Sequence, residues 1–397
     1  MSFTHLESLK LHLNAIDTQG LRRVRHSVAS VCQPHLVVDG QPMLAFNSND
    51  YLGLAAHPLV VEALREGASL YGAGSGASHL ISGHSQAHER LEELLADMLS
   101  PFVPSVRALY FSTGYMANLG VMTALADTAK GDITFFSDAL NHASLIDGIR
   151  LTRSPCQVYR HTDVVDLSLR LSSCQSVTKV VVTDGVFSMD GDIAPLKAMI
   201  ALCEQHGAWL LVDDAHGFGV LGETGAGVLQ HANVRSEQLI YMGTLGKAAG
   251  VSGAFVVAHE HFIEWMVQRS RSYIYTTAAA PALAHALLTS LRLIGGDEGR
   301  RRRAHLQNLI QQLSTSPVPA GWTRMASTTA IQPLVIGDNQ AVLQASDDLK
   351  AKGIWISAIR APTVPVNTAR LRITLSAAHT TEDVDRLVRA LSVESFS

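Results

Sequence analysis

Short, nearly continuous runs of apolar and β-branched residues recur along the chain from Phe46 onward. The runs are Arg107–Phe111, Ile133–Phe136, Lys179–Thr183, Trp209–Val212, Leu239–Met242 and Ala254–Val257. Such runs, alternating with segments of helical periodicity, are typical of buried strands in a sheet that helices cover on both faces. The pattern therefore predicts an α/β fold with a mostly parallel sheet.

Other periodicities add helices and a change of pattern after about residue 290. The helical signal is clearest at Ser85–Met98, where apolar residues recur at i, i+3, i+4 and i+7. At Arg370–Leu375 apolar and polar residues alternate, which predicts a strand with one apolar face and one outward polar face that carries Arg372. A helix ending at Gly353 and a final helix opened by Thr380-x-x-Asp383 are expected to flank such strands.

The 397-residue length favours one large domain with a smaller one attached. We predict a helical arm at residues 1–45 that includes a short extended segment, Leu36–Val38. A large domain is expected at residues 46–289, and a small α+β domain at residues 290–397.

Composition narrows the classes of protein that fit. Hydrophobic residues make up 47% of the chain, which suits a well-filled core and subunit interfaces. The net charge of −4 gives no general attraction to nucleic acid or to an anionic membrane. The four cysteines form no Cys-x-x-Cys pair, no stretch reaches the length of a membrane span, and the N-terminus lacks the apolar core of a signal peptide. We expect a cytoplasmic protein with reduced thiols.

Two apolar runs end in residues suited to chemistry, at the carboxyl ends of strands where α/β sheets bind ligands. Leu211-Val-Asp213-Asp-Ala-His216 supplies an aspartate and a histidine. The aspartate could pair with a cationic ring nitrogen, or Asp213 or Asp214 could equally cap a helix or turn. Lys247 lies between Gly246 and Ala248, which leaves room for an imine to a bulky aldehyde, although most lysines are surface residues.

Two further turns add a phosphate site and polar residues. Gly114 follows a predicted strand and opens a helix, whose N–H groups suit a phosphate, and Tyr115 adds an aromatic face. His142 and Ser188 each come after another predicted strand. Each turn alone could be structural. Together with an imine-forming lysine and an aspartate, they are what pyridoxal phosphate (PLP) requires of a protein.

With these residues in view, the chain resembles the α-oxoamine synthases, a family of fold-type-I PLP enzymes. The residues that carry the resemblance are Ser48–Leu54, Ser137–Leu145, Thr183–Asp192, Val212–Gly219, Gly243–Gly253, Ala330–Asn339 and Ala361–Leu375. The resemblance implies a seven-stranded, mostly parallel sheet in the large domain. It also implies a homodimer with its active site at the interface. From the net charge, neither nucleic acid nor a membrane is expected as a partner.

The resemblance also implies roles around the cofactor ring. Lys247 would form the imine and act as the acid and base on the substrate Cα, while Asp213 would pair with the pyridine nitrogen. His142 would stack on the ring, and Ser188 and His216 would contact its phenolic oxygen. 

Further residues are implied around the phosphate. Gly114, Tyr115 and Thr244 would hold the phosphate or its surroundings. Thr277, in Tyr275-Thr276-Thr277, would reach the phosphate of the partner subunit.

Substrate residues follow from the same resemblance. Arg372 would bind the amino-acid carboxylate, Arg22 and Thr363 would lie near the acyl substrate, and His142 could hydrogen-bond the thioester carbonyl. Ala330–Asn339 resembles more particularly the members that condense L-alanine with a pimeloyl thioester of coenzyme A or acyl carrier protein. A sibling enzyme that uses glycine, serine or another acyl chain is the alternative.

Three other interpretations have weaker support. Gly72-x-Gly74-x-Gly76 departs from a dinucleotide fingerprint, because a helix-like segment precedes it. His84-x-x-x-His88-Glu89 has helical spacing for a metal, but the sequence names no third ligand, so we expect no metal site. Arg300–Arg303 is expected to be a solvated helix face, with a carrier-protein site as the alternative.

Overall fold

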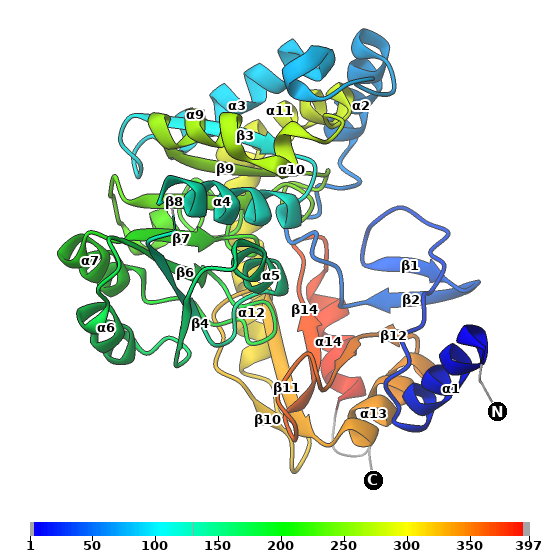
Figure 1. The fold of residues 1–397 in the computed structure, drawn as a ribbon. Helices are drawn as coiled ribbons and strands as arrows, with labels where there is room; N and C mark the ends of the chain where they lie inside the picture. The colour runs from blue at the N-terminus through cyan, green and yellow to red at the C-terminus, as the bar shows by residue number, and fades with distance from the viewer. Residues whose placement is uncertain (1–3, 130, 392–397) are drawn as a thin grey trace.

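The computed structural model describes residues 4–129 and 131–391 and is built around a seven-stranded sheet (Figure 1). The strand order is β3-β9-β8-β7-β6-β4-β5, and only β9 runs antiparallel to its two neighbours. This confirms the predicted mostly parallel sheet. The strands are β3 (Val106–Phe111), β4 (Ile133–Asp138), β5 (Cys156–Tyr159), β6 (Thr178–Asp184), β7 (Trp209–Asp213), β8 (Leu239–Thr244) and β9 (Ala254–His259).

Helices cover both faces of this sheet because its strands are apolar on both sides. Along β7, Leu210 and Val212 belong to one hydrophobic cluster and Leu211 to another, so the two clusters lie on opposite faces. The second cluster includes residues of α4 (Gly114–Thr128), α5 (Ala143–Thr152), α9 (Glu260–Arg269) and α10 (Arg271–Ile274). The first includes residues of α3 (Gln86–Leu99), α6 (Val164–Ser173), α7 (Leu196–His206), α8 (Val228–Ala232), α11 (Pro281–Gly295) and α12 (Asp297–Ser314).

A four-stranded antiparallel sheet, in the order β10-β11-β14-β13, lies below the large sheet in Figure 1. All six residues of β14 are buried, so the predicted outward polar face is wrong. β14 pairs with a strand on each side, and it packs against the large sheet's loops. Its elements are β10 (Thr323–Arg324), β11 (Ile331–Gly337), α13 (Asn339–Ala351), β13 (Ser357–Ile359), β14 (Ala369–Thr374) and α14 (Thr381–Ala390).

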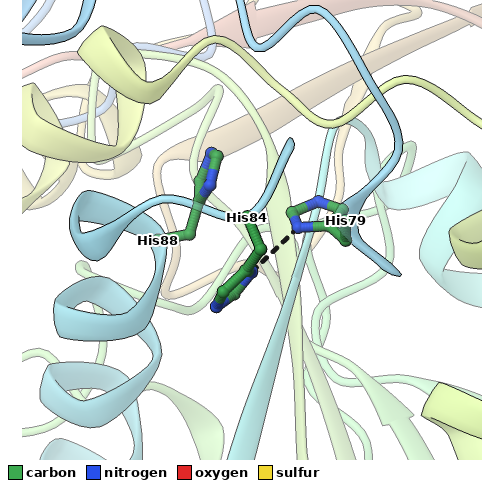
Figure 2. Close-up of side chains that lie close together, drawn as sticks. All are labelled: His79, His84 and His88. Carbon is green, nitrogen blue, oxygen red and sulfur yellow. Dashed lines mark hydrogen bonds between the residues drawn. The ribbon is translucent and has the colours of Figure 1, made fainter. Parts of the chain in front are cut away.

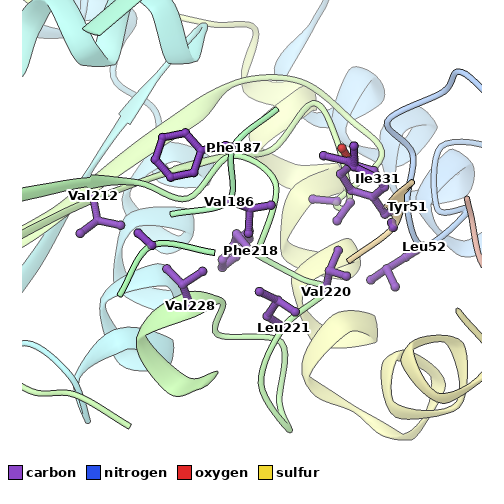
Figure 3. Packing of buried hydrophobic residues seen from close by; sticks show 14 of the residues in the cluster. Tyr51, Leu52, Val186, Phe187, Val212, Phe218, Val220, Leu221, Val228 and Ile331 are labelled. Carbon is purple, nitrogen blue, oxygen red and sulfur yellow. The ribbon is translucent and has the colours of Figure 1, made fainter. Parts of the chain in front are cut away.

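The two sheets share one interior. Figure 3 shows a single buried cluster that contains Val212 of β7, Phe218 of the segment after β7, and Ile331 of β11. Tyr51 belongs to the same cluster. The hydroxyl of Tyr51 faces the large sheet's loops, while its ring packs with residues of both sheets. The smaller sheet therefore packs beside the carboxyl edge of the large sheet.

The N-terminal part of the chain begins with α1 (His5–Thr18) and a hairpin of β1 (His35–Val38) and β2 (Gln41–Ala45). β2 also pairs in parallel with β12 (Ile354–Trp355), far along the chain. The following segment leads into α2 (Pro58–Tyr71) and the π-helical turn η1 (His79–Gly83). Residues 1–3 of the predicted arm and residues 392–397 of the predicted small domain lie outside the described residues.

Candidate active site

A cavity of about 200 Å³ opens at the carboxyl edge of the seven-stranded sheet. Strand register creates it: Asp184 at the end of β6 pairs with Asp213 at the end of β7, which pairs in turn with Met242 of β8. Side chains that follow these strands therefore converge. The lining residues are Gly114, Tyr115, Asn118, His142, Ser144, Asp184, Asp213, Ala215, His216, Met242, Thr244 and Lys247.

Lys247 is the amine of this cavity. Its Nζ lies 2.8 Å from Nε2 of His216, whose Nδ1 lies 2.5 Å from the hydroxyl of Tyr51. The Tyr51 hydroxyl donates to Oδ1 of Asn49. If Lys247 donates to Nε2, His216 must carry its proton on Nδ1 and donate to Tyr51, so a directed chain of hydrogen bonds leads away from the lysine.

Burial lowers the pKa of Lys247 to about 8, although Asp213 and Asp184 oppose the shift. Burial also lowers the pKa of His216 well below its usual value, and the positive charge of Lys247 adds to this effect. His216 is therefore a neutral imidazole near pH 7. The lysine is close to the point at which it exchanges its proton, as an acid–base group must be.

Asp213 is the buried carboxylate of the cavity. Its Oδ2 accepts a 2.7 Å hydrogen bond from Nδ2 of Asn118, and its Oδ1 accepts from the backbone N–H of Ala215. Nδ2 of Asn118 also donates to Ser144, while Oδ1 of Asn118 is buried without a partner. The aspartate is thus held by donors in one orientation, with an unsatisfied acceptor beside it.

His142 caps the start of α5 and lies over the same cavity. Its Nδ1 is 2.7 Å from the hydroxyl of Ser144, and its backbone N–H donates to Oδ2 of Asp184. Burial lowers the pKa of His142, partly offset by Asp213. Burial and repulsion from Asp213 raise the pKa of Asp184 well above its usual value. Oδ2 of Asp184 thus anchors the backbone of His142 at the start of α5.

The N-terminus of α4 forms another part of the cavity wall. Thr113 caps this helix by accepting from the backbone N–H of Met116, and Gly114 and Tyr115 form the first turn. The Tyr115 hydroxyl donates to Asp147 of α5 over 2.5 Å. Thr244, at the end of β8, also lines the cavity. Amide groups at such a helix start attract an anion.

Ser188 and Arg372 lie beside the cavity without lining it. Nε of Arg372 donates to the backbone carbonyl of Ser188 over 2.5 Å, and NH1 donates to Thr374. The guanidinium also contacts Oδ1 of Asn49, which accepts from Tyr51. Arg372 is thus connected to Lys247 through a chain of polar contacts.

Three sequence-predicted residues lie away from this cavity. Thr277 is exposed and does not line the cavity of its own chain. Arg22 pairs with Asp17 at the surface, and Thr363 is exposed. Arg360 joins the last two, because it donates to the carbonyl of Arg22 and accepts from the N–H of Thr363.

Sequence reasoning left several residues of this region without a role. Asn118, Ser144 and Asp184 line the cavity, and Tyr51 supports His216. Each lies inside a segment that resembles the family or follows a predicted strand, and that position is the available signal. Only the fold shows that Asn118 meets Asp213, since 95 residues separate them.

The donor set of the cavity fits PLP. Lys247 supplies an amine of lowered pKa, Asp213 a buried carboxylate, His142 a neutral ring, and α4 an anion-binding helix start. The unsatisfied Oδ1 of Asn118 shows that the cavity holds polar capacity that the protein itself does not use.

Comparison with known proteins agrees with this geometry. The chain matches the family described as aminotransferase class I and II over residues 41–391. It is 60% identical over 386 residues to the 8-amino-7-oxononanoate synthase of Janthinobacterium sp. (strain Marseille), covering 97% of each chain.

Solved structures show the same fold. A structure of serine palmitoyltransferase with PLP superposes with a TM-score of 0.87 at 29% identity, covering 97% of this chain and 96% of the other. The 8-amino-7-oxononanoate synthase of Francisella tularensis superposes with a TM-score of 0.72 at 28% identity, covering 88% and 96%. The chain belongs to the aminotransferase class I and II family and, within it, to the 8-amino-7-oxononanoate synthases.

Proposed function

We propose that the protein condenses L-alanine with a pimeloyl thioester to give 8-amino-7-oxononanoate, carbon dioxide and a free thiol, with PLP as cofactor. This is a carbon–carbon bond-forming acyl transfer that serves biotin synthesis. The observation that carries the proposal is the meeting of Lys247, Asp213 and His142 in one cavity beside the start of α4. The names of the relatives at 60% identity supply the reaction.

Residues of the cavity are assigned roles in this reaction. When bound, PLP supplies an electron sink for the negative charge that develops on the alanine Cα. Lys247 would hold the cofactor, and its Nζ would take the proton from the alanine Cα. Asp213 keeps a proton on the ring nitrogen, and Asn118 keeps Asp213 in place. His142 would hold the face of the ring, and Ser188 and His216 would hold its phenolic oxygen.

Substrate groups are assigned to the residues around the cavity. Arg372 binds the alanine carboxylate, and His142 hydrogen-bonds the thioester carbonyl. Gly114, Tyr115 and Thr244 hold the phosphate.

The acyl chain is proposed to enter past Arg22 and Thr363. Support comes from Arg360, which connects these two exposed residues. The thiol carrier is coenzyme A or acyl carrier protein.

We further propose that the protein acts as a homodimer in the cytoplasm. Thr277 would complete the phosphate site of the partner subunit, which agrees with its exposed position outside its own cavity. Within the described residues, no helix is long and apolar enough to cross a membrane.

The proposal is tested by mixing the PLP-loaded protein with L-alanine and a pimeloyl thioester. Carbon dioxide and free thiol should appear in equal amounts, and Lys247→Ala should abolish both. Glycine and serine replace alanine in parallel reactions, and coenzyme A and carrier-protein thioesters are compared. Absence of both products from a PLP-bound protein would exclude the synthase. Faster turnover with glycine or serine would favour a sibling reaction.

A further inference from the structure

Three histidines meet away from the active site, where α3 begins (Figure 2). One ligand nitrogen from each of His79, His84 and His88 lies within 4.8 Å of the others. Their ring centroids are 5.0–5.6 Å apart. His79 and His88 are buried, and His84 is exposed. The helical spacing expected of His84 and His88 is wrong, because His84 precedes α3, yet the fold supplies the third ligand that the sequence could not name.

The backbone holds these rings together. His79 opens the π-helical turn η1, a rare element that is frequent at functional sites. A Cβ on Gly83 would lie 2.1 Å from the carbonyl oxygen of Ala77, so this turn closes as tightly as glycine permits. The ring of His79 stacks on Tyr273, with centroids 4.6 Å apart. The cluster is therefore built from packed elements and does not depend on chance contacts between mobile side chains.

The hydrogen bonds show which nitrogens are available. Nδ1 of His79 lies 3.0 Å from Nδ1 of His84, so one of these atoms carries a proton that the other accepts. Nε2 of His88 donates to the carbonyl of Ala279, and Nδ1 of His88 accepts from the backbone N–H of Ser85. An imidazole binds a metal ion through a ring nitrogen that carries no proton. The hydrogen bonds leave Nδ1 of His88 and one Nδ1 atom of the His79–His84 pair in that state.

The geometry points to a site for a divalent transition cation of the zinc class, held by His79, His84 and His88. Zinc–nitrogen bonds of about 2.0–2.1 Å place tetrahedral ligand nitrogens about 3.3 Å apart, close to the separation of the His79 and His84 nitrogens. Ion binding would shift the shared proton to an Nε2 atom without releasing it. The bond from Ser85 to Nδ1 of His88 would give way, while the bond to Ala279 stays and orients the ring.

The choice of ion follows from the ligand set. Neutral imidazoles suit Zn²⁺, Co²⁺ or Ni²⁺, whereas Mg²⁺ and Ca²⁺ require oxygen ligands. Three ligands leave a fourth position for water on the exposed side of His84. The ion would tie the η1 turn to α3, because it takes ligands from both. His88 already joins α3 to the segment before α11 by donating to Ala279.

The test measures binding of Zn²⁺ to the PLP-loaded protein by titration calorimetry. We expect one ion per chain and a raised Tm, tetrahedral absorption bands with Co²⁺, and no comparable effect of Mg²⁺ or Ca²⁺. His84→Phe should weaken binding at least about tenfold. His84→Cys, which keeps a zinc ligand, should retain it. His12→Asn removes an exposed histidine of α1 and should leave binding unchanged.

His84 is exposed, so its variants leave the core packing intact. Activity is not a readout, and the result is therefore independent of the catalytic proposal. Equal affinity in the protein and in His84→Phe would place the ion elsewhere and overturn the site. Absence of binding by the unaltered protein, or its loss in His12→Asn, would do the same.

Discussion

At the scale of single residues, a chain of polar contacts links the amine of Lys247 to the side chain of Asn49. When Lys247 donates to Nε2 of His216, Nδ1 of His216 carries the proton and donates to Tyr51. The Tyr51 hydroxyl donates to Asn49, which Arg372 also contacts. The lysine side chain and the guanidinium are therefore linked through three groups, His216, Tyr51 and Asn49. Tyr51 is a positioning residue here, because it sets which nitrogen of His216 carries the proton.

Tyr51→Phe should remove that control. Loss of one buried hydrogen bond, about 1–1.5 kcal/mol, corresponds to a roughly tenfold fall in kcat. The pH profile of kcat should shift as well, because His216 can then carry its proton on either nitrogen. Tyr159→Phe, which removes another buried tyrosine hydrogen bond, is the control. A fall in kcat with an unchanged pH profile would mean that Tyr51 has only a structural role.

The lowered pKa of Lys247 has its own consequence. A neutral amine is needed to take up PLP, and burial makes Lys247 neutral above about pH 8 instead of above its ordinary 10.5. The rate at which the apoprotein takes up PLP should therefore rise through pH 8 and then level off. Stopped-flow absorbance at a series of pH values measures it. A rate that keeps rising beyond pH 10 would contradict the lowered pKa.

Much of the candidate site could be predicted from residues that follow apolar strands. Lys247, Asp213 and His142 were found in this way, and the structure brings them together. Asn118 and Tyr51 could not be assigned by spacing, because their roles depend on contacts with residues 95 and 165 positions away. Periodicity describes local structure, and it cannot report such pairs.

At the scale of elements, a charged histidine ties three loops of the sheet together. His161 follows β5, and its two ring nitrogens lie 2.9 Å from Asp138 and 2.8 Å from Asp192. Burial alone would lower the pKa of His161, but the two carboxylates raise it to about 10. The loop that carries Ser188 is thus fastened to the end of β4.

His161→Gln should destabilise the protein in a pH-dependent way. The folded-state pKa lies above the unfolded value of 6.5, so the stabilisation is fully present below pH 6.5 and is lost as pH rises through about 10. The Tm difference between the protein and the variant should therefore shrink over that interval. Thermal unfolding at pH 6 to 10 measures it, with exposed His261→Gln as control. A constant difference would refute the charged bridge.

The last helix offers a local test. Thr380 accepts from the backbone N–H of Asp383, and the Asp383 carboxylate accepts from that of Thr380, which confirms the predicted capping box. Thr380→Ala should lower the free energy of unfolding by about 1 kcal/mol. Urea denaturation measures the change. Thr381→Ala, one residue inside the helix, should have much less effect, and an equal loss in both variants would contradict the cap.

Strands with a long apolar run in the sequence were predicted correctly, and a strand with a short run was missed. Six predicted strands match strands of the large sheet. By contrast, β5 (Cys156–Tyr159), at the sheet edge, is only four residues long and buries only Tyr159, so its sequence gives too short a signal to be recognised. For β14 the alternation was read correctly, but its polar face is covered. An arginine in a sequence normally indicates a side chain exposed to solvent. Arg370 is nevertheless buried, because it pairs with Asp190.

For the whole molecule, the proposed dimer makes a sharp prediction. If Thr277 serves the partner's site, Lys247→Ala and Thr277→Asp should each be inactive alone. In mixed dimers one site receives both defects and the other none, so activity should return to about a quarter of normal after random re-association. The assay follows thiol release after mixing. Absence of recovery, with mixed dimers demonstrated, would place Thr277 at its own chain's site.

The pairing of β2 with β12 joins residues near position 45 to residues near position 354. During synthesis on the ribosome, the β1–β2 hairpin is completed early, but its third strand emerges only when about nine-tenths of the chain has been made. Until then one edge of β2 is open to pairing with other chains. Nascent or truncated chains that lack β12 should therefore bind chaperones more than the full chain does. Only chains that include the C-terminal part can close this edge.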